Sequence, residues 1–520
     1  QTELRRVRNF PARIELELGS LLRMPVYSSP DAVVDVIVPV YSSPEQTLRC
    51  LDSVLAARTD TAFELVVIDD ASPETELRTA LRTLAEQNRL TLLENSLNQG
   101  FVASVNRGMQ LHPGRDVVLL NSDTRVADGW LDRLKAAARR EASTGTVTPL
   151  SNNATLCTIP QPETLDTAAM DALCARVNAG ITVDIPTAVG FCMYIKRRVL
   201  DEVGYFNQAL WGKGYAEEND FCLKAATLGW RHLAAADVFV WHEGGVSFGA
   251  SKADRIQSNL NKLNQIYPDY AALIERFEAR DPLAPCRNRI VREWLKQHSA
   301  RYVLFVIHGL GGGTQVAADT LARALATEGY PVLELMSKSP GLWQLTVPGL
   351  PYGLQYGCGD HWAALLDDLR YLGVWHVHYH QTMQFPLQIW DIPEALATAY
   401  DVSLHDYLPI CPRINLLDES GYYCDEARYQ PTACNRCLAL NGFDDDETNH
   451  RILRNKFAEF GQDVAHWREH YARILAGARR VIAPSQTVAT IFGEHFPNLN
   501  LAVIPHPATA APVAVSARVS

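Results

Sequence analysis

The chain has 520 residues, of which 47% are hydrophobic and 21% charged, and its formal net charge is -11 at pH 7. This length exceeds what one hydrophobic core supports, so we expect two or three domains of a globular protein. The acidic balance argues against nonspecific binding to phosphate backbones, which excludes nucleic acid as a predicted partner.

The sequence predicts neither a membrane span nor a secretory leader. No apolar run approaches the ~20 residues that a membrane-spanning helix needs, and residues 1–20 lack the apolar core of a signal peptide. We therefore expect a cytoplasmic protein, with peripheral contact at the cytoplasmic face of the inner membrane as an open alternative. The 11 cysteines, mostly scattered singly among apolar residues, are typical of reduced core residues.

Apolar strand patterns alternate with helical patterns along the first half of the chain. Strands are predicted at 36–40, 63–68, 90–93 and 116–120, and helices at 45–57, 74–86 and 101–111. This alternation predicts an α/β fold with a mostly parallel sheet, in which ligands bind at the carboxyl ends of the strands.

A second α/β start follows at RYVLFVIHGLGGGT, residues 301–314. We therefore divide the chain into an N-terminal extension, a first α/β domain, a helical linker, a second α/β domain and a tail. Their predicted bounds are 1–32, 33–252, 253–299, 300–507 and 508–520.

Polar clusters follow three of the predicted strands of the first domain. They are Tyr41, the pair Asp69 and Asp70, and the run from Asn121 to Asp123. Each has a structural alternative, because Asn, Ser and Asp favour turns and cap helices. Their arrival at one sheet edge favours a ligand site.

Further polar residues stand at predicted helix starts. In LNQGFVASVNRG, Asn98, Gly100 and Asn106 surround a helix N-terminus, a place where anions bind, although an ordinary loop and cap would look the same. In WGKGYAEEND, Glu217 and Glu218 precede a helix. Helix capping explains acids there, yet crowded carboxylates raise one another's pKa, which suits a general base.

The segments VPVYSSPE, VVIDDAS, LNQGFVASVNRG, LLNSDT, GYAEEND and VWHEGG occur in the order seen in family-2 glycosyltransferases. Roughly residues 33 to 250 thus resemble that family. The resemblance implies a GT-A fold and transfer of a hexosyl or deoxyhexosyl group from a nucleotide-diphosphate sugar, with inversion at the anomeric carbon.

The resemblance also implies residue roles. Donor-binding roles fall on Pro39, Tyr41, Asp69 or Asp70, Asn98, Gly100, Asn106, Ser122 and Asp123. Asp123 and His242 are expected to hold Mg²⁺ or Mn²⁺, and Trp211 and Asp220 to contact the acceptor. Glu218 matches the catalytic base, with Glu217 beside it, and which of the two takes the proton stays open.

Two positions depart from the family pattern. Asn121 replaces the first acid of the metal-binding DxD motif, so we expect Asp123 to touch the metal directly and Asn121 not to. Glu218 replaces the commoner Asp at the base position.

The second domain resembles the Rossmann-like N-terminal lobe of a retaining GT-B glycosyltransferase of family 4. The resemblance rests on HGLGGGTQVAADTLARALATEGYPVLEL, HVHYHQ, LHDYLPICPRINLLD and RRVIAPSQTVATIF. The sequence ends where the second, nucleotide-binding lobe of such an enzyme would begin. We expect a truncated bifunctional transferase; the alternative is a lobe that serves packing or acceptor binding.

Four cysteines cluster inside this second domain, at Cys411, Cys424, Cys434 and Cys437. One CxxC pair with two further cysteines in a loop-rich stretch is a candidate structural zinc site. A disulfide and thiols without metal are the alternatives. His405 and Asp406 are site residues or loop caps.

The leading functional hypothesis is a metal-dependent inverting glycosyltransferase that extends a bacterial surface glycan, such as an O-antigen or capsule, on a glycan or lipid-linked glycan acceptor. A sugar nucleotidyltransferase would need a Gly-rich, basic signature near the first strand, which VPVYSSPE lacks. The remaining alternative is a noncatalytic glycan-binding or scaffold protein built from transferase lobes.

Overall fold

The computed structural model describes residues 33–162, 164–244, 251–339, 341–350, 353–357, 361–418, 420–424, 430–441 and 448–506. The predicted N-terminal extension and tail lie outside these residues. The chain divides into two compact units, Gln1–Leu283 and Ala284–Ser520. The division falls inside the segment that the sequence predicts as a helical linker.

The first unit is built on an eight-stranded mixed sheet in the order β3-β2-β1-β4-β8-β6-β9-β7. Its strands are β1 (Val34–Val40), β2 (Phe63–Asp69), β3 (Thr91–Glu94), β4 (Val117–Leu120), β6 (Thr144–Leu150), β7 (Thr182–Ile185), β8 (Cys192–Ile195) and β9 (Arg231–Phe239). The strands β3, β2, β1 and β4 run parallel, whereas β8 is antiparallel to β4. A separate two-stranded ladder joins β5 (Thr124–Arg125) to β10 (Trp241–His242).

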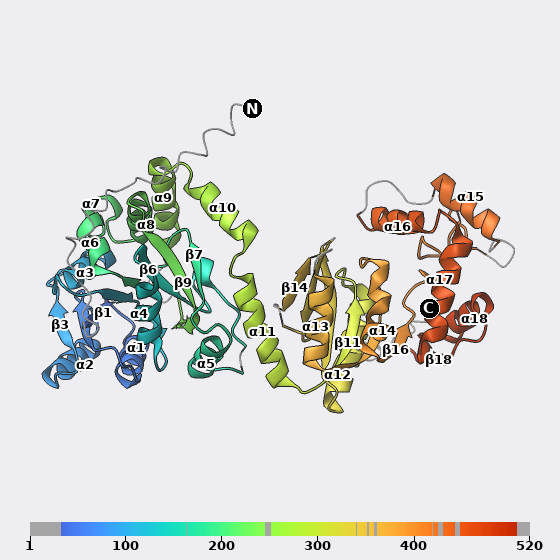
Figure 1. Cartoon of the computed structure of the whole chain (residues 1–520), viewed down its shortest axis with the longest axis horizontal. Helices are drawn as coiled ribbons and strands as arrows, with labels where there is room; N and C mark the ends of the chain where they lie inside the picture. Colours follow the sequence, from blue (N-terminus) through green and yellow to red (C-terminus); the bar gives the residue numbers. More distant parts are fainter. Residues whose placement is uncertain are drawn as a thin grey trace, which may run out of the picture. The chain divides into compact units, whose positions relative to one another are not determined.

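Helices surround this sheet (Figure 1). They are α1 (Pro44–Ala56), α2 (Thr75–Glu86), α3 (Phe101–Met109), α4 (Trp130–Arg140), the 3₁₀ turn η3 (Thr155–Cys157), α5 (Thr167–Val177), α6 (Arg197–Val203), α7 (Gln208–Trp211), α8 (Glu217–Thr227), α9 (Ser251–Ile266) and α10 (Tyr270–Arg280). Alternate strand residues such as Ile37 and Leu119 bury one sheet face against Val105 of α3 and Phe221 of α8. Leu263 of α9 joins the same core, so the start of the predicted linker packs as part of the first unit.

The second unit has its own eight-stranded sheet, in the order β14-β13-β12-β11-β15-β16-β17-β18. Its strands are β11 (Tyr302–Ile307), β12 (Val332–Ser339), β13 (Leu342–Thr346), β14 (Leu354–Gly357), β15 (Val374–Tyr379), β16 (Ala399–Ser403), β17 (Arg480–Ala483) and β18 (Leu501–Val503). In the part of the sheet with the order β12-β11-β15-β16-β17-β18, each strand is parallel to its neighbour. The chain leaves β11 first toward β12 and later toward β15, which makes a topological switch point between β11 and β15.

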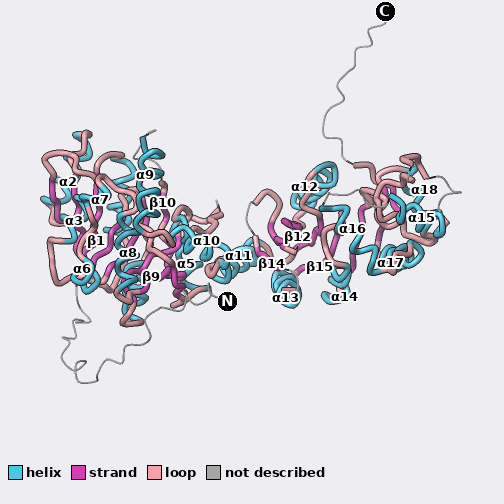
Figure 2. The backbone as a smooth tube through the Cα atoms, turned by 90° about the horizontal axis from the view of Figure 1, so that it is seen from above, coloured by secondary structure: helices cyan, strands magenta, loops and turns pink. Residues whose placement is uncertain are grey.

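Helices again accompany the strands, as the colours of Figure 2 show. They are α11 (Ala284–His298), α12 (Gly312–Thr327), α13 (Trp362–Leu372), the 3₁₀ turn η4 (Leu387–Asp391), α14 (Ile392–Leu396), α15 (Pro431–Asn441), α16 (Thr448–Glu459), α17 (Val464–Gly477) and α18 (Gln486–His495). The predicted α/β class is thus confirmed for both halves, whereas the GT-B assignment of the second stays a prediction. Within the described residues, every helix is too short or too polar to cross a bilayer.

Candidate functional site

The polar clusters of the first unit leave the sheet at one edge. Parallel pairing sets Val40 opposite Asp69 and Ile37 opposite Leu119, so β1, β2 and β4 end at the same side of the sheet. The chain turns directly after β4, and β5 then pairs with β10, which brings His242 opposite Thr124. Two residues remote in sequence, Asp123 and His242, therefore meet at this edge.

Asp123 and His242 present two ligand atoms to each other. Oδ1 of Asp123 lies 3.5 Å from Nε2 of His242, while Nδ1 of His242 lies 2.6 Å from the carbonyl oxygen of Asn153. Because a carbonyl can only accept, Nδ1 carries a hydrogen and donates it, and Nε2 is the ring atom that faces the carboxylate. An imidazole nitrogen beside a carboxylate, with a carbonyl bonded to the other ring nitrogen, is the arrangement of a candidate metal site.

Neighbouring groups fix both side chains. Phe191 stacks on the His242 ring with centroids 5.0 Å apart, and Asn152 bonds both the N–H and the carbonyl of His242 at 2.9 Å. Gly244 N donates to Asp123 Oδ2 at 3.1 Å. Burial raises the pKa of Asp123, but the hydrogen bond and charge of His242 and the Gly244 N–H outweigh it and hold this pKa below its ordinary value. Asp123 is therefore ionised at neutral pH.

Glu217 and Glu218 open helix α8 after an unusual backbone. Tyr215 and Ala216 have φ of 78° and 77°, a left-handed conformation that costs about 1–2 kcal/mol for an L-residue. Strain of this kind persists only where the surrounding structure imposes it, and it is frequent at functional sites. Here it sets the direction in which the two carboxylates enter the fold.

The two carboxylates have different surroundings. Glu217 is 5% exposed, and within the described residues its Oε2 has no hydrogen-bond partner. Glu218 is half-buried, and its carboxyl carbon lies 3.6 Å from where a Cβ on Gly190 would stand. Gly190 precedes Phe191, the residue stacked on His242. Glu218 thus adjoins the Asp123–His242 pair through Gly190 and Phe191.

Both carboxyl groups bind their protons more tightly than usual. Burial, then the charge of Glu218, raises the pKa of Glu217 well above its ordinary value. Burial also raises the pKa of Glu218. A proton acceptor with a raised pKa is a stronger base, so the pair fits the predicted role in proton transfer.

The raised pKa of Glu217 predicts a pH-dependent change in stability. Its carboxyl stabilises the fold most when protonated, below the unfolded pKa, and this contribution is lost as pH rises through the folded pKa. Glu217→Gln keeps the group neutral, so we expect a melting temperature several degrees above wild type at pH 8 and a smaller difference at pH 4. Thermal unfolding followed by circular dichroism at both pH values measures this, with Glu45→Gln on the exposed face of α1 as control. Equal melting temperatures at pH 8 would contradict the assignment.

Asp69 and Asp70 are buried and accept hydrogen bonds from the protein itself. Asp69 Oδ1 accepts from Ser72 N at 2.8 Å. Asp70 accepts from Asn95 Nδ2 at 2.7 Å and from the backbone N–H groups of Gln99 and Gly100, each at 2.8 Å. Asp70 therefore holds the loop that leads into α3, and any contact of either carboxylate with a donor stays a prediction.

This loop packs against the stretch before Glu217. Lys213 Nζ donates to Asn98 Oδ1 at 2.8 Å. At Gly100, whose φ is 88°, a Cβ would stand 2.8 Å from the Cα of Lys213, so only glycine fits. Asn106 exchanges two hydrogen bonds with the backbone of Phe206, at 2.8 and 3.1 Å. Asn98, Gly100 and Asn106, which the sequence predicts to bind the donor, thus each contact another part of the protein.

Removing the Asp70 carboxylate should loosen this loop. Asp70→Ala leaves buried donors without an acceptor, and each such loss costs about 1–3 kcal/mol. We expect the free energy of unfolding in urea to fall by at least about 2 kcal/mol on that basis. Asp52→Ala, at an exposed position of α1, should change it by less than about 0.5 kcal/mol. An unchanged urea midpoint for Asp70→Ala would contradict this role.

The predicted acceptor residues lie in the core. Trp211 and Asp220 are each 2% exposed, and Trp211 Nε1 donates to Asp220 Oδ2 at 3.1 Å. Lys224 and Tyr267 also bond Asp220, both at 2.7 Å. Through these contacts Trp211 and Asp220 connect α7, α8 and the segment after α9. Both side chains are too buried to contact an acceptor in this conformation.

Other members of the predicted set lie nearer the solvent. Tyr41 is 39% exposed, and Pro39 and Ser122 are half-buried. The backbone of Asn121 is bonded to Phe191 and Thr124. The sequence interpretation missed Phe191, Asn152 and Asn153. A signal was present, since SNNA follows the apolar strand β6 as NSDT follows β4.

A second acidic group lies at the opposite ends of the strands. Ligand atoms of Asp35, Glu64 and His112 all lie within 4.8 Å of one another, near the starts of β1 and β2. Arg115 NH1 stands between the carboxylates, 2.9 Å from Asp35 and 2.6 Å from Glu64. The guanidinium of Arg115 supplies the positive charge that a metal ion would otherwise bring to these two carboxylates. We interpret the group as an ion-pair network that fastens the two strand starts.

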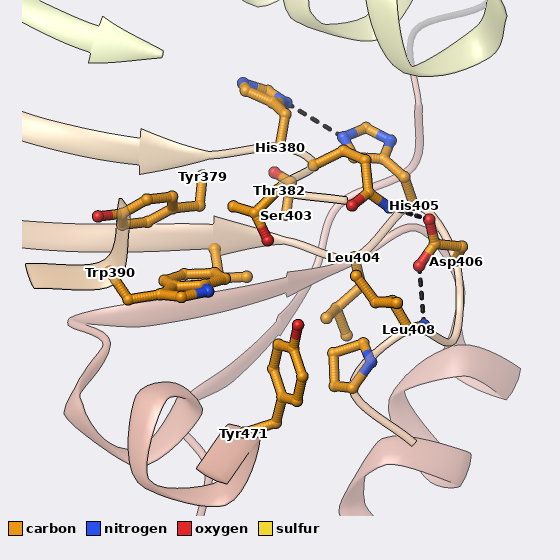
Figure 3. Close-up of a pocket in the computed structure, with 13 residues that line it drawn as sticks. Tyr379, His380, Thr382, Trp390, Ser403, Leu404, His405, Asp406, Leu408 and Tyr471 are labelled. Atoms are coloured by element: carbon orange, nitrogen blue, oxygen red, sulfur yellow. Dashed lines mark hydrogen bonds between the residues drawn. The ribbon is translucent and has the colours of Figure 1, made fainter. Parts of the chain in front are cut away.

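In the second unit, aromatic and polar residues gather where β15 and β16 end (Figure 3). His380 Nδ1 lies 3.1 Å from His405 Nε2. Burial, then the neighbouring His506, lowers the pKa of His405 to about 3. Asp406 accepts from Leu408 N at 2.8 Å, as a loop cap does. Burial raises its pKa to about 6.

The four clustered cysteines line one pocket, together with Asp418, Arg436 and Arg468. Burial raises the pKa of Cys411 to about 12, and the proximity of Cys434, Cys424 and Cys437 adds to the rise. These sulfurs therefore lie within electrostatic range of one another.

Comparisons with known proteins bear on the first unit. Residues 35–204 match the family model "Glycosyl transferase family 2". No curated protein matches the sequence. Among solved structures, GalNAc-T7 with UDP, GalNAc and Mn²⁺ aligns with a TM-score of 0.36 and 14% identity, over 52% of this chain and 52% of that one. The mannosyltransferase PcManGT from Pyrobaculum calidifontis, in complex with GDP-Man and Mn²⁺, aligns with a TM-score of 0.35 and 20% identity, over 59% of this chain and 86% of that one.

This chain therefore spans about half the length of the GalNAc-T7 chain. The predicted family-2 resemblance is confirmed over the matched residues, which hold β1 to β4 and the loop with Asp123. Residues 35–204 of this chain therefore match a glycosyltransferase family 2 domain.

Proposed function

We propose that the first unit transfers a sugar from a nucleotide-diphosphate sugar to a glycan hydroxyl, with inversion at the anomeric carbon and with the help of Mn²⁺ or Mg²⁺. The observation that carries this proposal is the pairing of Asp123 with His242 at a sheet edge that Glu218 adjoins through Gly190. Both solved structures named above hold Mn²⁺ and a nucleotide or nucleotide-sugar.

The chemistry of the donor set fits a divalent cation. Asp123 is ionised, and Nε2 of His242 lies 3.5 Å from it, so a carboxylate oxygen and an imidazole nitrogen stand side by side as candidate ligands. Carboxylate oxygen and imidazole nitrogen suit Mn²⁺, and a carboxylate alone suits Mg²⁺. Bound there, the cation would offset the charge that develops on the leaving nucleoside diphosphate.

The protein's own carboxylates act on the acceptor. We assign the base to Glu218, because it is less buried than Glu217 and adjoins the Asp123–His242 pair. Its carboxylate takes the proton of the acceptor hydroxyl as that oxygen bonds to the anomeric carbon, while the bond from that carbon to the donor phosphate oxygen breaks. Attack on the side opposite the leaving group inverts the configuration.

The biological setting follows from the resemblance of the sequence. We propose an acceptor of the bacterial surface-polysaccharide type, free or lipid-linked, and work at the cytoplasmic face of the membrane. Trp211 and Asp220 would then act by holding α7 and α8 in place, because both are buried.

A nucleotide-sugar screen tests this function. The purified chain is incubated with Mn²⁺, UDP-, GDP-, CDP- and dTDP-sugars and glycan acceptors, while nucleotide release and product are measured and NMR gives the anomeric configuration. We expect one donor class to turn over and the product to be inverted. Retention would overturn the inverting mechanism, and donor binding without turnover of any acceptor would favour the glycan-binding scaffold.

A further inference from the structure

We propose that Cys411, Cys424, Cys434 and Cys437 form a four-thiolate zinc site that fastens the chain between β16 and α17 of the second unit. This site is distinct from the transferase site of the first unit and does not depend on the function proposed for it.

The sulfurs come from three separate stretches and line the same pocket. Cys411 follows the turn after β16, and its N–H bonds the carbonyl of Tyr407 at 2.9 Å. Cys424 ends a tight turn and bonds the carbonyl of Leu416, also at 2.9 Å. Cys434 and Cys437 stand three residues apart on α15, which puts both on one helix face. Four cysteines at one pocket supply the ligand set of a structural zinc site.

Arginine side chains point at two of the sulfurs. Arg468 NH2 lies 3.3 Å from the sulfur of Cys434, and Arg413 NH1 lies 3.9 Å from the sulfur of Cys437. A thiol is a weak acceptor for a guanidinium, whereas a zinc-bound thiolate is a good one. Four thiolates around Zn²⁺ carry a net charge of about −2, which the guanidinium groups of Arg413 and Arg468 offset. The guanidinium groups of Arg413 and Arg468 would thus hold metal-bound sulfurs in place through charge-assisted hydrogen bonds.

The backbone between the first two cysteines is strained. Ile414 and Leu416 have φ of 64° and 51°. The left-handed conformation is a genuine outlier for a β-branched residue such as Ile414. Strain of about 1–3 kcal/mol per residue persists only where surrounding structure over-determines it. Hydrogen bonds of Ile414 with Cys411 and Tyr407 hold this stretch, and a metal bound at Cys411 and Cys424 would add a cross-link on both sides of it.

Zinc is the metal that this ligand set selects. Thiolates bind Zn²⁺ in preference to Mg²⁺ or Ca²⁺, and four of them complete a closed tetrahedral shell. Among the described residues, Asp35, Glu64 and His112 are the group of three whose ligand atoms lie within 4.8 Å of one another, so the four cysteine sulfurs are spaced more widely than that. The sulfurs therefore have to draw closer when zinc binds, to reach Zn–S distances of about 2.3 Å.

Metal analysis of the full chain, purified under reducing conditions, tests the site. We expect about one equivalent of zinc by inductively coupled plasma mass spectrometry and four sulfur neighbours at about 2.3 Å by X-ray absorption. Cys411→Ser and Cys434→Ser should lose the zinc, whereas Cys286→Ala, at a cysteine of α11 outside the pocket, should keep it. Because the wild-type absorption spectrum needs no variant, the test survives a variant that fails to fold.

Three results would overturn the proposal. They are zinc well below one equivalent, a mass two hydrogens lower that shows a disulfide among the four cysteines, and an iron–sulfur absorption spectrum. As a further test, Arg468→Ala should release zinc to a chromogenic chelator about 10- to 100-fold more readily. Arg473→Ala, at an exposed position of the same helix α17, should release it like wild type. Equal release by the two variants would contradict a role of Arg468 in holding a metal-bound sulfur.

Discussion

Glu218→Gln is expected to lower kcat about 100- to 10,000-fold, the usual contribution of a positioned general base. The substitution keeps the size of the side chain but replaces the basic carboxylate, which accepts the proton, with a neutral amide. Because we assign Glu218 to the acceptor and not to the donor, we expect KM for the nucleotide-sugar to stay within a few-fold of wild type. Initial rates of nucleotide release at saturating acceptor measure both constants.

Glu217→Gln is the matched comparison, since the two residues are adjacent in α8 and both have raised pKa values. We expect a loss of less than about tenfold, because Glu217 is more buried than Glu218. Burial raises the pKa of Glu218, whereas the charge of Glu218 adds to the raised pKa of Glu217, so the acid limb of the pH–rate profile should stay near its wild-type position. A larger loss in Glu217→Gln than in Glu218→Gln would exchange the two roles.

The fold of the first unit follows largely from hydrophobic periodicity. The alternation of apolar strands with amphipathic helices predicts the parallel run of β1, β2 and β4, and with it the common edge where Asp69 and Asn121 emerge. The antiparallel insertion of β8 between β4 and β6 was not predicted, because a single buried strand has the same apolar pattern in either direction.

The pairing of Asp123 with His242 could be expected from the resemblance but not from local pattern. It depends on the ladder between β5 and β10, each of two residues, which is too short to show any periodicity. The role of Asp70 shows a second limit. A carboxylate after a strand looks the same in sequence whether it faces a ligand or, as here, the backbone N–H groups of Gln99 and Gly100.

Asp123→Asn is expected to abolish metal-dependent binding of the donor nucleotide and to lower kcat/KM at least about 100-fold. A bound divalent cation contributes several kcal/mol to stabilising the leaving diphosphate, and each 1.4 kcal/mol is a factor of ten. The amide keeps the shape of the side chain and its contact with Gly244 N, so the fold should be retained. Asp128→Asn, at an exposed carboxylate that pairs with Arg58, is the control and should behave as wild type.

Isothermal titration with Mn²⁺ and the nucleoside diphosphate of the active donor separates metal binding from catalysis. His242→Ala should weaken Mn²⁺ binding but leave part of it, because the ionised carboxylate of Asp123 remains, and its activity should be partly restored at higher Mn²⁺ concentration. Asn121→Ala should leave Mn²⁺ affinity within about threefold of wild type, since the backbone of Asn121, and not its side chain, carries the bonds to Phe191 and Thr124. Loss of Mn²⁺ binding in Asn121→Ala, with binding retained in Asp123→Asn, would move the metal to Asn121 and refute the site as drawn.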